Sequence, residues 1–150
     1  MDHSPSHAQP DIHWPLIGIV FLGGCVGTAA RYAFAQIPAA GAGGYFHIGT
    51  LVANLVACLV YSGLSAFLFN ASWITSGRKE YYNRGLGMGV CGGLSTMSTL
   101  GVESFLSMHG SAVFDGLVYL CVTFALGLLA AAFGAWIGST VALIPKRDAQ

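Results

Sequence analysis

Four apolar segments, each long enough to cross a lipid bilayer, occupy most of the chain. They lie at residues 15–36, 48–70, 85–108 and 112–144. A helix that crosses a bilayer needs roughly 20 mostly apolar residues, and backbone groups in lipid must be hydrogen-bonded within the protein, which favours helices. The sequence therefore predicts an all-α integral membrane protein whose four transmembrane helices form one domain over residues 15–145.

The composition agrees with a membrane protein and argues against several other classes. Hydrophobic residues make up 55% of the chain and charged residues only 8%, with a mean hydropathy of +0.67, outside the range of ordinary soluble domains. The formal net charge is zero, so a nucleic-acid surface is not expected. Phosphate-loop, HExxH and GxSxG motifs are absent from the sequence, so the protein is not expected to be an enzyme.

Both ends of the chain are polar. Residues 1–14 lack the basic segment of a signal peptide, so they predict a disordered tail, and residues 146–150 form a short charged tail. Four spans place both tails and the loop between the second and third segments on one side of the membrane. That side carries five of the six basic residues, Arg78, Lys79, Arg84, Lys146 and Arg147. The positive-inside rule therefore predicts that both termini are cytoplasmic.

Residues 89–104, "GVCGGLSTMSTLGVES", are unusually polar and rich in glycine for a membrane span. The adjacent Gly92 and Gly93 each weaken a helix by about 1 kcal/mol relative to alanine. The hydroxyl run that follows can bond to freed carbonyl groups, and irregular backbone at membrane depth is tolerated where it is buried in protein or lines an aqueous cavity. The third span is therefore predicted to be a broken helix.

Glycines four residues apart occur in three of the segments. They are Gly23 and Gly27, then Gly85, Gly89 and Gly93, then Gly134 and Gly138. Each set lies on one face of a helix and allows a neighbouring backbone to approach closely. These glycines are expected to serve helix packing.

Three polar side chains lie inside or at the margin of the apolar segments, namely Arg31, Asn54 and Glu103. Such residues are costly in a membrane and usually face a bundle interior or an aqueous path. Taken singly, each is equally well interpreted as a structural residue, with Arg31 extending to the interface. Together with the hydroxyl run, they favour a polar conduit.

Three stretches, "GGCVGTAARY", "GTLVANLVA" and "GVCGGLSTMSTLGVES", resemble the motifs of the small bacterial fluoride channels (the Fluc/CrcB family). The resemblance covers nearly the whole chain from residue 16. It implies a multi-pass protein of the bacterial inner membrane that exports fluoride passively. It also implies an antiparallel dimer with two pores and a central sodium ion, held by main-chain carbonyl groups that Gly92 and Ser95 would supply here.

The resemblance also implies roles for the polar side chains. Arg31 would raise the local anion concentration near the entry. Asn54, Ser98 and Thr99 would line the anion path, since fluoride is tightly hydrated and needs N–H and O–H donors in exchange for water. Glu103 would lie beside this path. Tyr119 and Thr123 share a face of the fourth segment and are further candidates.

Two positions depart from the family pattern. Met97 and Leu100 stand where the family has phenylalanines, whose positively polarised ring edges would contact the anion. Methionine can fill a similar volume, and leucine offers only an apolar wall. The part of the implied anion path that Met97 and Leu100 would form therefore differs from that of the family.

Several functional hypotheses follow from these features. The first is a homodimeric fluoride channel. The second is a one-sided or non-conducting subunit of a heterodimeric channel, favoured by the five-to-one bias of basic residues, because a chain that inserts both ways needs balanced charge. A proton-coupled multidrug exporter would need an acidic residue in the first span, where Arg31 is the only charge. A purely structural membrane protein is the remaining alternative.

Overall fold

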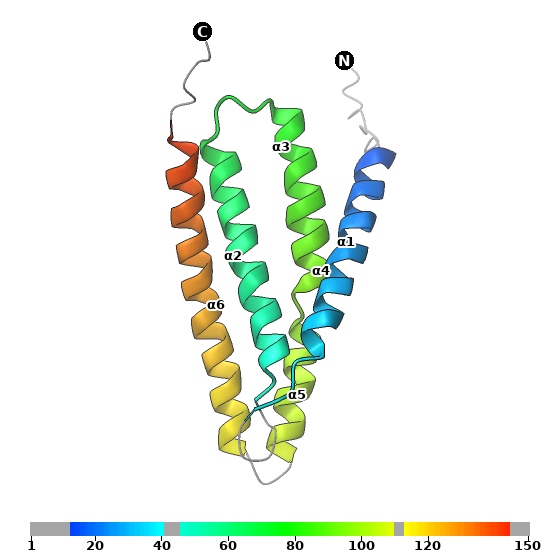
Figure 1. Ribbon diagram of the computed structural model, residues 1–150, viewed down its shortest axis with the longest axis vertical. Helices are drawn as coiled ribbons and strands as arrows, with labels where there is room; N and C mark the ends of the chain where they lie inside the picture. The colour runs from blue at the N-terminus through cyan, green and yellow to red at the C-terminus, as the bar shows by residue number, and fades with distance from the viewer. Residues whose placement is uncertain (1–12, 41–45, 110–112, 145–150) are drawn as a thin grey trace, which may run out of the picture.

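The computed structural model describes residues 13–40, 46–109 and 113–144 (Figure 1). Apart from one isolated β-bridge between Ala40 and Phe46, the regular structure of these residues is helical. The helices are α1 (Trp14–Ala35), α2 (Ile48–Asn70), α3 (Ser76–Tyr82), η1 (Asn83–Cys91), α4 (Gly92–Leu94), α5 (Met97–His109) and α6 (Val113–Ala142). Apart from His13 and Trp14, the predicted tails lie outside the described residues.

Three of these helices, α1, α2 and α6, are long and apolar enough to cross a membrane. Their bounds lie within two residues of three of the predicted segments, and α2 coincides with its segment. The prediction of an all-α membrane protein is therefore confirmed for the fold class.

The remaining predicted span differs from α1, α2 and α6 in two ways. Its helical path begins at Ser76, so the second half of the polar stretch that we expected to be a loop is helical. Thr75 precedes this helix in an extended conformation and its carbonyl accepts a hydrogen bond from Lys79, while Glu80 and Arg84 form an i,i+4 ion pair at 2.9 Å. The path then continues through a π-helical stretch, η1, and is interrupted after Leu94.

The spaced glycines lie where helices pack against each other, as predicted. A Cβ atom at Gly23 or Gly27 of α1 would collide with backbone atoms of η1, and one at Gly93 would lie 2.5 Å from the carbonyl oxygen of Gly24. On the other side of the molecule, Gly134 and Gly138 of α6 meet the backbone of α2 in the same way. Two close helix pairs, α1 with η1 and α2 with α6, therefore hold the bundle together.

Replacing Gly27 by alanine is expected to destabilise the bundle by about 2 kcal/mol, since a methyl group added to a packed interface forces backbone shifts. The added carbon would collide with the carbonyl of Val90. Gly24→Ala on the same helix is the matched control, because its Cβ would meet nothing within 4 Å. Thermal unfolding of the purified variants in detergent measures the difference, and equal melting temperatures would contradict this packing.

The two ends of the bundle differ in charge. The first residues of α1, the last residues of α2 and α6, and the whole of α3 lie at one end (Figure 1). Arg78, Lys79 and Arg84 lie at this end, whereas Arg31 lies close to the opposite end of α1. The described part of the chain thus keeps the asymmetry of basic residues that the sequence predicts.

Candidate functional site

The interruption between α4 and α5 is held by Asn54 of α2. Ser95 has an extended backbone, with φ −72° and ψ 149°. The amide oxygen of Asn54 accepts a hydrogen bond from the Thr96 backbone N–H at 2.7 Å, and its Nδ2 donates to the Thr96 carbonyl at 3.2 Å. An amide group has two N–H donors, so Asn54 keeps one N–H for another partner.

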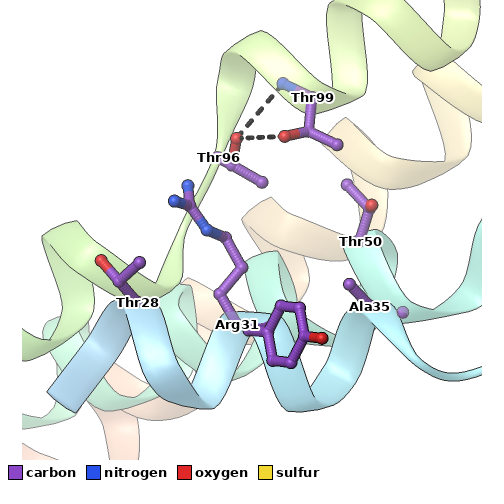
Figure 2. A pocket seen from close by; sticks show the side chains of 8 residues that line it. Thr28, Arg31, Ala35, Thr50, Thr96 and Thr99 are labelled. Carbon is purple, nitrogen blue, oxygen red and sulfur yellow. Dashed lines mark hydrogen bonds between the residues drawn. The ribbon is translucent and has the colours of Figure 1, made fainter. Parts of the chain in front are cut away.

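Thr96 caps the first turn of α5. Its hydroxyl accepts a hydrogen bond from the Thr99 backbone N–H at 3.2 Å and donates to the Thr99 hydroxyl at 2.9 Å (Figure 2). Threonine favours this position because its side-chain oxygen satisfies one of the free N–H groups of the helix start. The exposed Ser98 lies 3.4 Å from the same hydroxyl. Thr96 is 5% exposed and was not among our predicted site residues.

These bonds leave two carbonyl groups without their usual helical donors. The Gly92 carbonyl would accept from the N–H of Thr96, which binds Asn54 instead. The Ser95 carbonyl would accept from the N–H of Thr99, which binds the Thr96 side chain. Both Gly92 and Ser95 are exposed and line a cavity of about 370 Å³ beside α2. Freed carbonyl oxygens of this kind suit a hard cation.

Arg31 lines a second cavity, of about 240 Å³, on the other side of the interruption. Its side chain extends from α1 toward Thr96 (Figure 2), and the lining residues are Thr28, Arg31, Tyr32, Ala35, Gly49, Thr50, Thr96 and Thr99. The ion pair between Arg84 and Glu80 is the only one within residues 13–40, 46–109 and 113–144. Within those residues no acidic side chain forms an ion pair with Arg31, so its positive charge favours an anion in this cavity. The Thr50 hydroxyl on the cavity wall is already bonded to the Glu103 carboxylate.

A third cavity, of about 280 Å³, brings Asn54, Met97 and Leu100 together. Its other lining residues are Cys58, Ser95, Thr96, Thr123, Phe124, Gly127, Leu128 and Ala131. Thr96 lines both this cavity and the one that contains Arg31. Five of the seven predicted anion-path residues therefore line these two cavities, which share Thr96, whereas Ser98 and Glu103 line neither.

Glu103 accepts hydrogen bonds from two other helices. One carboxylate oxygen accepts from the Thr50 hydroxyl at 2.7 Å, and the other accepts from the Tyr119 hydroxyl at 2.8 Å. Tyr119 is fully buried, and its hydroxyl also lies 3.2 Å from the His47 carbonyl. Thr50 lines the cavity of Arg31 as well. Glu103 thus joins α2, α5 and α6 directly beside that cavity.

The whole of this site lies within the match to a known protein family. The family described as "CrcB-like protein, Camphor Resistance (CrcB)" matches residues 18–135. The chain belongs to the CrcB family.

Relatives in the CrcB family match the chain over most of its length. Fluoride-specific ion channel FluC 2 of Bifidobacterium longum is 55% identical over 138 residues, which are 92% of this chain and 76% of that protein. Fluoride-specific ion channel FluC 2 of Halalkalibacterium halodurans is 34% identical over 128 residues, 85% of this chain and 88% of the relative. Fluoride-specific ion channel FluC 1 of Cutibacterium acnes is 35% identical over 116 residues, covering 77% and 80% of the two chains.

Sequence reasoning about this CrcB protein missed three residues of the site. Thr50 lies on the same face of α2 as Asn54, four residues away, and this spacing could have identified it. Thr96 could have been identified as a helix-capping threonine, because it precedes a hydroxyl-rich turn. Phe124 carries no polar signal, so only the packing of α6 against α5 places it in the cavity with Met97 and Leu100.

Proposed function

We propose that this chain is a subunit of a fluoride-selective channel that gives passive fluoride export and fluoride resistance. The proposal rests on the 55% identity, over 92% of the chain, to a protein named as a fluoride-specific ion channel. Export would be driven by the negative-inside membrane potential, after HF enters and dissociates in the cytoplasm. The ion-channel names of the relatives agree with the expectation that the protein is not an enzyme.

The chemistry of the two cavities that share Thr96 supports an anion path. A dehydrated fluoride ion needs strong donors in place of its water. Arg31 attracts the anion, and the Thr99 hydroxyl, which accepts from Thr96, keeps its own proton for donation. The remaining N–H of Asn54 is a donor in the cavity with Met97 and Leu100. Ser98 adds a hydroxyl group at the start of α5.

We further propose an antiparallel dimer with a central sodium ion at its interface. Gly92 and Ser95 are exposed in the single chain, and their freed carbonyl groups would hold the ion together with the same groups of a second subunit. A Cβ atom added to Gly92 meets nothing within 4 Å, so this backbone is open to a partner. Main-chain oxygen ligands at a helix break suit sodium, a hard cation.

The proposed location is the bacterial inner membrane, with four spans and both termini in the cytoplasm. The fourth span would be the path from η1 through α4 to α5, in addition to the three long apolar helices. The grouping of Arg78, Lys79 and Arg84 at the end of the bundle where α1 begins supports this orientation.

A second candidate function is that of one subunit in a heterodimeric fluoride channel. The bias of basic residues supports a fixed orientation, and Met97 and Leu100 lack the ring edges found in the family motif. In this case a paired homologue would insert in the opposite orientation. This chain would then contribute the sodium carbonyls and part of one pore.

Reconstitution into liposomes tests these proposals. Liposomes loaded with potassium fluoride and containing the purified chain are expected to release fluoride when valinomycin allows potassium to leave, as recorded with a fluoride electrode. Release by the chain alone supports the homodimer, and release only after a CrcB homologue from the same genome is added supports the heterodimer. An absence of release in both cases would contradict the channel function.

A further inference from the structure

The cavity that contains Met97 and Leu100 also contains an aromatic side chain from another helix. Phe124 of α6 lines it together with Asn54 and Thr123. Phe124 is 49% exposed in the single chain, so its ring is not enclosed in a hydrophobic core. The position of this ring matters because Met97 and Leu100 leave α5 without an aromatic residue on this cavity.

The ring edge of Phe124 is the positively polarised group that α6 can offer to an anion here. Thr123 also lines the cavity, but its hydroxyl donates its proton to the Tyr119 carbonyl at 2.8 Å. The other α6 residues on the cavity are Gly127, Leu128 and Ala131, whose side chains are apolar or absent. An aromatic ring carries a positively polarised edge even though it is hydrophobic, so it can contact an anion that has lost water without holding it too tightly.

Asn54 provides the other half of such a site. Two of its hydrogen-bonding groups are occupied by the Thr96 backbone, which fixes the orientation of the amide. Asn54 lines the cavity from α2 and Phe124 lines it from α6, and the two bonds to Thr96 leave one Asn54 N–H for a further acceptor. An N–H donor and a ring edge in one cavity form a site for a small, poorly polarizable anion.

We infer that Phe124 is a fluoride-contacting and selectivity-determining residue, supplying from α6 the aromatic edge that Met97 and Leu100 do not supply from α5. This inference rests on the proposed channel function. The ring acts on the anion itself, so the residue affects both fluoride flux and the preference for fluoride over chloride.

The test measures fluoride and chloride flux in liposomes for Phe124→Leu, Phe124→Tyr and the double variant Phe124→Leu with Leu100→Phe. Wild-type protein is used alone or with its partner, whichever conducts. We expect Phe124→Leu to lower fluoride flux about tenfold, because one contact between an aromatic ring and the anion is lost. Phe124→Tyr keeps the ring edge and is expected to retain flux. The double variant is expected to recover flux, because it returns an aromatic ring to the same cavity.

Phe133→Leu is the matched control. Phe133 lies on the same helix, is 55% exposed and stacks on Trp136 with ring centroids 5.9 Å apart. Its loss is expected to leave flux and selectivity unchanged.

The outcomes separate this inference from the proposed function. Wild-type flux that persists in Phe124→Leu, with an unchanged ratio of fluoride to chloride, would overturn the role of Phe124 and leave the channel function standing. Equal losses in Phe124→Leu and the double variant, with an unchanged ion ratio, would assign Phe124 a purely structural role and also overturn the inference. Wild-type protein that conducts neither alone nor with a partner would overturn both proposals.

Discussion

Replacing Asn54 by alanine is expected to lower fluoride flux by about 100-fold, because two backbone groups lose their partner at once. The Thr96 N–H and carbonyl both bind the Asn54 amide, and Thr96 is 5% exposed. A buried backbone group without a partner costs about 1–3 kcal/mol. The start of α5, which carries Met97, Ser98 and Thr99, would shift.

Two further variants separate the support of the backbone from the contact with the anion. Asn54→Asp keeps an acceptor for the Thr96 N–H but loses the donor to the Thr96 carbonyl and places a negative charge in the proposed path. We expect flux to be lost, with a smaller loss of stability than in Asn54→Ala, which loses both bonds. Asn70→Ala is the control, since Asn70 lies on the same helix, is exposed and donates only to the Ala66 carbonyl at 2.8 Å. Flux in liposomes and thermal unfolding in detergent distinguish these cases. Near-normal flux in Asn54→Ala would refute a role for this residue in the path.

The helical class and the closely packed helix faces of this protein could be predicted from the sequence because both depend on local patterns. Length and apolarity define α1, α2 and α6. Glycine spacing identifies the packed faces of α1, η1 and α6, whereas the pairing of α1 with η1 and of α6 with α2 is known only from the structure. The helical start at Ser76 was missed, because its polar residues look like a loop unless the Glu80–Arg84 pair and the extended Thr75 are considered together.

The candidate site was less predictable because its bonds join residues far apart in the sequence. The hydroxyl run suggested a break near Gly92 and Ser95, but which residue binds the freed backbone depends on how α2 packs. Asn54 lies 42 positions from Thr96, and Thr50 lies 53 positions from Glu103. Tyr119 could be placed on the same face as Thr123, but not beside Glu103. The position of Phe124 in the cavity depends only on how α6 packs against its neighbouring helices.

Removal of Glu103 is the prediction with the largest expected effect on stability. The carboxylate receives hydrogen bonds from Thr50 and Tyr119, which are 7% and 0% exposed. In Glu103→Leu both hydroxyl groups would lose this acceptor, and each buried polar group left unsatisfied costs about 1–3 kcal/mol. The Tyr119 hydroxyl can still donate to the His47 carbonyl at 3.2 Å. We therefore expect a total loss of about 3 kcal/mol, seen as a lower melting temperature.

Glu103→Gln separates the negative charge from the hydrogen bonds. Glutamine has the same length and keeps an oxygen acceptor, and its NH₂ group can donate to a hydroxyl oxygen. The Tyr119 hydroxyl can then donate its proton to the His47 carbonyl. Glu103→Gln is therefore expected to melt close to the wild type. Glu80→Leu is the control for loss of an acidic residue, because its exposed ion pair with Arg84 contributes at most about 1 kcal/mol. If Glu103→Leu and Glu80→Leu had the same melting temperature, the contact of Glu103 with α2 and α6 would not stabilise the fold. Any loss of flux in Glu103→Leu would then come from the loss of the negative charge beside the Arg31 cavity.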